Sequence, residues 1–219
     1  IPYIYGLTPG ELARYLNDTE FGGKVRLTVV PMQGWNRRMT YSDTGLPWVL
    51  PSPHVPTAET SLYYPATGIL GELSYASIGV GYTMPFRLIA TSWADADELS
   101  RRLNDLKLRG IMFRPIHYKP YYAFGKGMDI HGVEVYITDP HTPVDLTLVQ
   151  FYAMQELAAM NSSKAIFSQQ HEASRLDMFD KVCGTRKVRA EFSRRHKVED
   201  ILPIWRSDFK EMSRPYRLY

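Results

Sequence analysis

Residues 34–56 read GWNRRMTYSDTGLPWVLPSPHVP, and this stretch sets the organisation of the chain on either side of it. Neither a 3.6-residue nor a 2-residue apolar repeat continues across it, so the sequence predicts a long loop. Ordered loops of this length usually serve binding or catalysis. Its main aromatic and polar side chains are Trp35, Trp48, Asn36, Arg37 and His54. Flat apolar rings beside polar groups suit a sugar, and the loop is therefore a candidate binding surface.

Regular structure is predicted before the loop. Residues 8–11 (TPGE) form a capping box with proline at the first helical position, which predicts a helix reaching about Asn17. Residues 25–30 (VRLTVV) are rich in β-branched side chains and predict a strand.

The sequence after the loop predicts alternating helices and strands. The expected elements are a brief helix over 57–64 stopped by Pro65, a loop over 67–83, a strand over 86–90, a helix from Asp95 to Gly110, strands over 111–118 and 133–138, and a helix from Asp145 to about Met160. Val133, Val135 and Ile137 alternate with polar or aromatic residues, which is typical of a half-buried strand. The last quarter is expected to be helical, with a kink or a delayed start at Pro203.

Composition narrows the class of protein. The 219 residues are 44% hydrophobic and 22% charged, as in a folded globular protein. The net charge of +3 is weak, and the basic cluster 194–197 is better explained as a solvated helix end, so no nucleic-acid partner is expected. No apolar run is long enough for a transmembrane helix. The single cysteine, Cys183, excludes an internal disulfide.

Two carboxylates stand out as candidates for glycoside hydrolysis, which usually needs an acid and a second carboxylate. Asp43 and Glu72 lie in the two loop-rich segments and would be able to face one cleft. For Asp43 the alternative is a structural one, since Ser-Asp-Thr-Gly is also an ordinary turn sequence. Glu72, between Gly71 and Leu73, has no evident turn or capping role.

Cofactor and metal signals are weak. Asp129, His131, Asp139 and His141 are possible metal ligands, but their spacing fits no recognised metal motif. The segment 79–81 (GVG) lacks the third glycine of a dinucleotide-binding loop. We therefore expect no metal and no cofactor.

Several longer motifs together resemble a bacterial family of exo-acting β-N-acetylmuramidases (NamZ-like). The motifs are 34–37 (GWNR), 43–49 (DTGLPWV), 51–53 (PSP), 64–68 (YPATG), 79–86 (GVGYTMPF), 137–139 (ITD), 179–181 (FDK), 184–185 (GT), Trp205, Tyr216 and 218–219 (LY). They span nearly the whole chain, and the DTGLPWV motif followed by PSP is long and specific.

The resemblance implies a fold of mixed α+β or α/β class. Residues 1–85 would be the tail of a Rossmann-like catalytic domain, and residues 86–219 a smaller α+β domain with a mixed sheet and C-terminal helices. A change of composition near Pro85 agrees with this division. The first residues, IPYIYG, do not read as a signal peptide or as the natural start of a domain, so we expect a C-terminal part of a longer protein.

The resemblance also implies a function. The family removes N-acetylmuramic acid from the non-reducing ends of peptidoglycan fragments, in a cleft between its domains. Glu72, or a glutamate upstream of this chain, would then be the acid and Asp43 the second carboxylate or an orienting group. The residues expected to bind the sugar are Trp35, Asn36, Arg37, Trp48, His54, Tyr82 and Thr83. Amino-sugar glycans are the expected partners and an exported location is expected, although a cytoplasmic one stays open.

The chain departs from the family pattern where the family commonly has an arginine and this chain has Val80. An arginine is the natural bidentate partner of the lactyl carboxylate of muramic acid. A non-catalytic glycan-binding relative is therefore the alternative to an enzyme.

Overall fold

The computed structural model describes residues 2–205 and 209–219 of the chain. Its helices are α1 (Pro9–Thr19), α2 (Thr60–Gly71), α3 (Ala96–Asp105), α4 (Thr147–Met160), α5 (Ala173–Val182), α6 (Arg186–Arg195), α7 (Val198–Trp205) and α8 (Phe209–Met212). Its strands are β1 (Leu88–Thr91), β2 (Ile111–Tyr118) and β3 (Ile130–Ile137). The predicted first helix, the helix after Asp95, the strand over 111–118 and the helical last quarter are all confirmed.

The sheet is small and entirely antiparallel within the described residues. Its strand order is β1-β3-β2, with Ile89 opposite Val133 and Phe113 opposite Val135. The expected mixed sheet is therefore wrong. The connection from β2 to β3 contains no helix to serve as a parallel crossover, and the chain returns in the opposite direction, so these two strands pair antiparallel. The class of fold, mixed α and β, is confirmed.

The central position of β3 changes its burial. The sequence predicted a half-buried strand, yet Glu134 on its polar side is only 5% exposed. Strand β3 has a neighbour on each edge, and Glu134 also lies under the Arg87 guanidinium at 2.6 Å. A buried carboxylate is tolerated when such a partner neutralises it.

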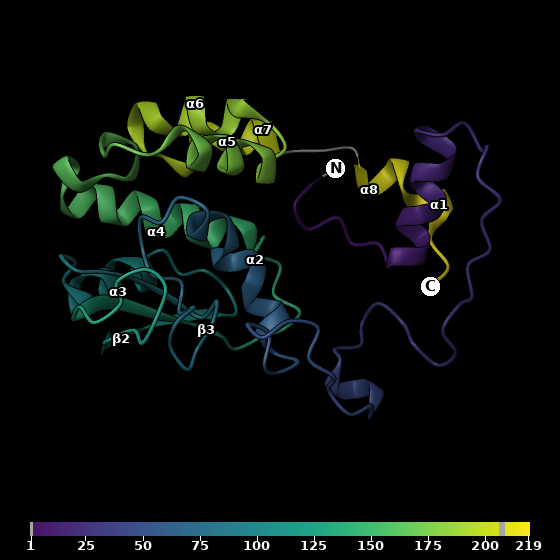
Figure 1. Cartoon of the computed structure of the whole chain (residues 1–219), viewed down its shortest axis with the longest axis horizontal. Coiled ribbons are helices and arrows are strands. Elements are labelled where there is room, and N and C mark those ends of the chain that lie inside the picture. The colour runs from purple at the N-terminus through teal and green to yellow at the C-terminus, as the bar shows by residue number, and fades with distance from the viewer. Residues whose placement is uncertain (1, 206–208) are drawn as a thin grey trace.

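Helices cover one face of the sheet in two layers (Figure 1). Helix α3 packs on β2 and β3, and α4 packs on α3 and α2. Helices α5, α6 and α7 form the outer layer beyond α4. The opposite face of the sheet is closed by a small apolar cluster that includes Leu88, Tyr118 and Tyr82.

Helix α2 continues through Pro65, so the predicted stop at this residue is wrong. A proline in a helix interior removes one backbone hydrogen bond. The lost bond is the one from residue 65 to the Ser61 carbonyl, and the fully buried Gln150 of α4 stabilises the turn that follows. Its amide nitrogen donates to the Pro65 carbonyl at 2.8 Å, and its oxygen accepts from the Leu70 N–H at 2.8 Å. The predicted loop over 67–83 consequently begins only after Gly71.

The strand predicted over residues 25–30 is absent, because this segment has irregular backbone. Its apolar side chains stand in solvent, with Val25 50% and Val30 86% exposed. A single extended segment is not stable without neighbouring strands to satisfy its backbone groups, and no described strand lies beside it. Residues 2–59 contain one α-helix and one 3-10 helix and no strand, so the Rossmann-like expectation and the boundary near Pro85 stay predictions.

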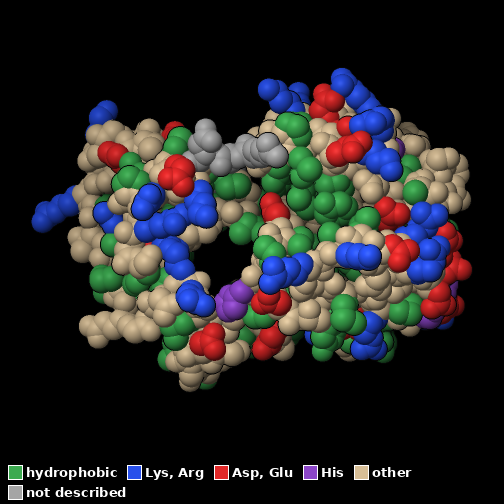
Figure 2. Space-filling model, turned by 180° about the vertical axis from the view of Figure 1, so that it is seen from behind, with side chains coloured by type: hydrophobic (Ala, Val, Ile, Leu, Met, Phe, Trp, Pro, Cys, Tyr) green, Lys and Arg blue, Asp and Glu red, His purple; other side chains and the backbone are tan. Residues whose placement is uncertain are grey.

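The two ends of the chain form a second lobe, away from the sheet (Figure 1). Tyr15 of α1 packs edge-on against Phe209 and Tyr216, which lie near the C-terminus. The loop block 34–56 runs between this lobe and the sheet lobe. Seen from behind, an opening lies between the two lobes, with Lys and Arg side chains along part of its rim (Figure 2).

The fully buried Glu11 holds the terminal lobe together. Its carboxylate accepts from the Thr8 N–H at 2.8 Å, from the Leu218 N–H at 2.5 Å and from Arg37 at 2.5 Å. Burial by itself disfavours the charged form, but the hydrogen bonds from Arg37, Leu218 and Thr8 outweigh it and lower the pKa of Glu11 to about 2.

Substitution Glu11→Gln is expected to remove an acid-sensitive part of the stability. A carboxylate whose pKa falls from about 4.5 to about 2 on folding stabilises the folded state above pH 4.5 and loses this effect as the pH falls towards 2. The expected loss at neutral pH is about 3 kcal/mol, measured by urea unfolding between pH 7 and pH 3.

The control is Glu20→Gln, at the exposed end of α1 where the side chain makes no hydrogen bond with the described residues. It should unfold like the original chain at every pH. Equal stability of Glu11→Gln and Glu20→Gln at pH 7 would contradict the role given to Glu11.

Candidate functional site

The loop block 34–56 is confirmed as mostly loop, with only the 3-10 helix η1 (Ser42–Thr44) inside it. Its predicted site residues do not gather in one place. Trp35 packs edge-on against Tyr219 with 4.9 Å between ring centroids. Arg37 donates to the Tyr219 carbonyl and the Gly6 carbonyl in addition to Glu11. These two residues therefore fasten the C-terminus to the loop.

Asp43 occupies a turn at the exposed surface. Its Oδ2 accepts from the backbone N–H of Thr40 at 2.7 Å and from the Thr40 hydroxyl at 2.8 Å. These hydrogen bonds lower the pKa of Asp43 from its usual range. The geometry is that of the ordinary turn considered from the sequence, and the catalytic role of Asp43 stays a prediction.

Trp48 and Asn36 also have local partners. The Trp48 ring packs edge-on against Tyr41 at 4.8 Å, and its indole N–H donates to the Val55 carbonyl at 3.2 Å. The Asn36 Oδ1 accepts from the Arg38 N–H at 3.0 Å. Local contacts with Tyr41 and Val55 thus fix the Trp48 ring within the loop.

Glu72 lies in a different setting, at the C-terminal end of α2. It lines a cavity of about 280 Å³ together with mostly apolar groups. These are Tyr64, Gly68, Gly71, Ala76, Ile78, Val80, Phe86, Ala123 and Phe124, with Ser74 and Ser77 as the hydroxyl-bearing members. Within the described part of the chain, the Glu72 carboxylate makes no hydrogen bond or ion pair. An unpaired carboxylate in an apolar recess is available for a ligand.

We refer to this recess as the Glu72 cavity. Strained backbone concentrates around it. Ser74, Phe86 and Ala123 have φ angles of 48°, 64° and 61°, and all three line the cavity. Only five described non-glycine residues have positive φ, so more than half of them meet at this one place. Such conformations cost free energy and tend to cluster at functional sites. The concentration therefore marks the Glu72 cavity as the leading candidate site.

An aromatic loop between β2 and β3 forms the outer wall of the site. Its residues 119–127 read KPYYAFGKG, and the exposed fractions of Tyr121, Tyr122 and Phe124 are 72%, 49% and 37%. Two of the predicted sugar-binding residues reach this loop. His54 stacks on Tyr122 at 6.0 Å, and Tyr82 stacks on Tyr121 at 6.2 Å.

Residues 121–124 are therefore near all three candidates: Tyr121 and Tyr122 contact Tyr82 and His54, and Ala123 and Phe124 share the cavity wall with Glu72. Thr83 is exposed in the same loop as Tyr82. Reasoning from the sequence missed Tyr121, Tyr122 and Phe124. The signal was present: three aromatic residues, bracketed by Pro120 and Gly125, are not expected to be exposed without a purpose.

Several of the remaining sequence candidates lie elsewhere. His131 faces His117 across β2 and β3, with 2.8 Å between their Nδ1 atoms. Among the described residues, no three His, Cys, Asp or Glu side chains are grouped as a metal site would require. In the same part of the chain, no helix is both long and apolar enough to cross a membrane.

Gly81 allows the aromatic loop to approach. Its φ is 96°, and a Cβ at this position would lie 1.9 Å from the Tyr122 carbonyl oxygen. We expect Gly81→Ala to displace residues 121–124 and to lower the free energy of unfolding by about 2 kcal/mol or more. Thermal unfolding measures the loss, and the intrinsic fluorescence of the exposed tyrosines reports the displacement.

The matched control is Gly127→Ala in the same loop. Its φ is also positive, at 74°, but a Cβ there meets nothing within 4 Å. Only the backbone penalty of about 1–2 kcal/mol is expected. If both variants lost the same stability, the close approach at Gly81 would not matter.

Comparison with known proteins gives a consistent picture. Two family models match the chain: the N-terminal part of exo-β-N-acetylmuramidase NamZ over residues 1–59, and its C-terminal part over residues 62–219. The peptidoglycan β-N-acetylmuramidase NamZ of Bacillus subtilis is 34% identical over the whole chain. The alignment covers 51% of that relative, so the chain spans about half its length.

A solved structure agrees with the fold. The crystal structure of a DUF1343 family protein from Bacteroides fragilis superposes on the whole chain with a TM-score of 0.95 at 45% identity, and the match covers 58% of that protein. The C-terminal family model and both relatives extend over the elements that build the Glu72 cavity. The chain belongs to the NamZ family of exo-β-N-acetylmuramidases.

Proposed function

We propose that this chain serves the hydrolysis of peptidoglycan fragments, with release of N-acetylmuramic acid or a related amino sugar from their non-reducing ends. The observation that carries the proposal is the unpaired Glu72 carboxylate in a strained, largely apolar cavity. Membership of the NamZ family supports the same chemistry. Export of the protein is part of the proposal, because peptidoglycan lies outside the cytoplasmic membrane.

Glu72 is assigned the role of the acid that protonates the leaving oxygen. Its carboxyl group lines the recess and makes no hydrogen bond or ion pair with the described residues, so it is available to a glycosidic oxygen. Glycoside hydrolysis usually needs a second carboxylate. Among the residues that the structure describes, no other Asp or Glu lines this cavity. The second group has to come from residues outside the cavity wall, and Asp43 is a poor source because Thr40 already holds its Oδ2.

The aromatic loop and its partners bind the sugar in this proposal. Tyr121 and Tyr122 offer exposed rings for the apolar faces of a pyranose. His54 and Tyr82 stack on these rings and fix their orientation. Trp35 and Arg37 act indirectly by holding the loop block against the C-terminus.

A second candidate function is glycan binding without hydrolysis. It is favoured by Val80 and Ile78, which present aliphatic groups to the cavity where a bidentate arginine would bind a lactyl carboxylate. Such a protein would bind the glycan through the same aromatic surface and leave it intact.

The deciding experiment incubates the full-length protein with a MurNAc–GlcNAc disaccharide and measures free MurNAc. Wild type is expected to release the sugar, and Glu72→Gln should lower kcat by at least about 100-fold, the range typical of a lost acid catalyst. Asp43→Asn is expected to keep most of the activity, because an amide oxygen still accepts the Thr40 hydrogen bonds.

Glu59→Gln is the matched control, since Glu59 lies at the exposed opposite end of α2. It should leave the rate unchanged. Binding of the disaccharide with no release of MurNAc by wild type would favour the glycan-binding function. Full activity of Glu72→Gln would show that another residue acts as the acid.

A further inference from the structure

A second and larger cavity adjoins the Glu72 cavity. Its volume is about 400 Å³, at the small end of the range found for ligand sites. Its wall consists of Leu73, Ser74, Tyr75, Trp93, Lys164, Gln169, Gln170, His171, Glu172 and Arg175. Three separate segments supply these residues: the turn after α2, the segment between β1 and α3, and the segment leading into α5.

The two cavities meet at Ser74, which lines both. Glu72 lines the Glu72 cavity and Leu73 lines the larger cavity, so two successive side chains of this turn belong to different cavities. The positive φ of Ser74 lets the chain turn in this way. Because Ser74 is exposed, a molecule bound against Glu72 would reach the larger cavity by passing over this residue.

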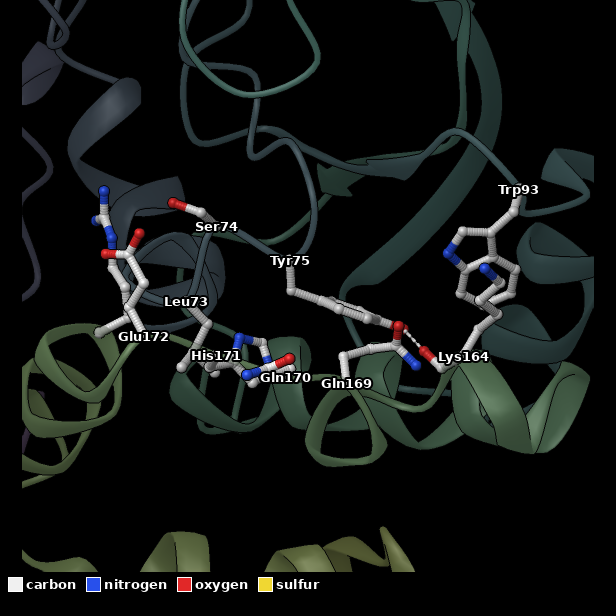
Figure 3. Close-up of a pocket in the computed structure, with 10 residues that line it drawn as sticks. Leu73, Ser74, Tyr75, Trp93, Lys164, Gln169, Gln170, His171 and Glu172 are labelled. Carbon is white, nitrogen blue, oxygen red and sulfur yellow. Dashed lines mark hydrogen bonds between the residues drawn. The ribbon is translucent and has the colours of Figure 1, made fainter.

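The two ends of the larger cavity are lined by different residues. Ser74 and Glu172 lie at one end, Trp93 and Lys164 lie at the other, and the Tyr75 ring extends between them (Figure 3). The Tyr75 hydroxyl is fixed because it donates to the Lys164 carbonyl at 2.7 Å. The Lys164 side chain is exposed and has no ion pair with any described residue. A chain that enters beside Ser74 thus ends at an unpaired cation.

Polar side chains occupy the middle. His171 Nε2 lies 2.6 Å from the Ile166 carbonyl, which can only accept, so Nε2 carries a proton and Nδ1 has no hydrogen-bond partner among the described residues. The Gln170 amide makes no hydrogen bond with the described residues and offers both a donor and an acceptor. These groups suit the hydroxyl and acetamido substituents of an amino sugar.

We propose that this cavity binds the sugar units that follow the terminal one in a peptidoglycan strand. An N-acetylglucosamine unit would pass Gln170 and His171, and the lactyl carboxylate of the next muramic acid would meet Lys164. The site therefore prefers glycan strands to disaccharides. The inference rests on the proposed function and adds a preference for chain length to it.

The test compares a MurNAc–GlcNAc disaccharide with the tetrasaccharide (MurNAc–GlcNAc)₂ in the full-length protein. Loss of a charge-assisted hydrogen bond in Lys164→Ala is expected to raise KM for the tetrasaccharide by roughly 5- to 10-fold. KM for the disaccharide and kcat for both should stay unchanged, because only the longer chain reaches Lys164. Lys164→Arg should restore most of the tetrasaccharide affinity.

The control is Lys187→Ala, which removes an exposed lysine from α6, a helix that contributes nothing to the cavity. Equal effects of Lys164→Ala and Lys187→Ala, or equal effects on the two substrates, would overturn the proposal. Calorimetric binding of both oligosaccharides to Glu72→Gln gives a second readout. If wild type releases no MurNAc, the proposed function fails, while selective loss of tetrasaccharide binding in Lys164→Ala still supports the cavity.

Discussion

The insertion of Gln150 into helix α2 is the interaction on which both cavities depend. Its buried amide bridges the Pro65 carbonyl and the Leu70 N–H, so the last turns of α2, which end at Gly71, are held against α4. The turn that follows places Glu72 on one side and Leu73 on the other. A buried side-chain amide with both ends satisfied is costly to displace, because its loss would strand two backbone groups.

A second constraint sets the terminal lobe. Glu11 receives hydrogen bonds from the start of α1, from the loop block and from the C-terminal segment. Segments near both ends of the chain and the GWNR motif at residues 34–37 are thus joined through one carboxylate. Trp35 and Arg37 look like ligand-binding residues in the sequence, but in the structure both contact Tyr219 at the C-terminus. Their chemistry is suited to a sugar and equally to packing against a tyrosine and a backbone carbonyl.

Local patterns in the sequence predicted most of the regular structure. The capping box at Thr8, the Asp95 cap and the apolar pattern of residues 111–118 depend only on neighbouring residues, and each element forms where expected. The predictions that were wrong depend on distant residues. Residues 25–30 have strand propensity but no neighbouring strand among the described residues. Pro65 lies in a helix whose next turn is held by Gln150 of α4, and Glu134 is paired with Arg87, 47 residues away.

The sequence by itself determined the family and the mixed α and β class and proposed Glu72 as a candidate, because motifs and side-chain chemistry are local properties. Only the tertiary structure decided which candidates meet. It separated Trp35, Arg37 and Asp43 from Glu72, and it added Tyr121 and Tyr122 to the site. The physical reason is that a loop's position follows from close approaches such as that of Gly81 to Tyr122, which join residues far apart in the chain.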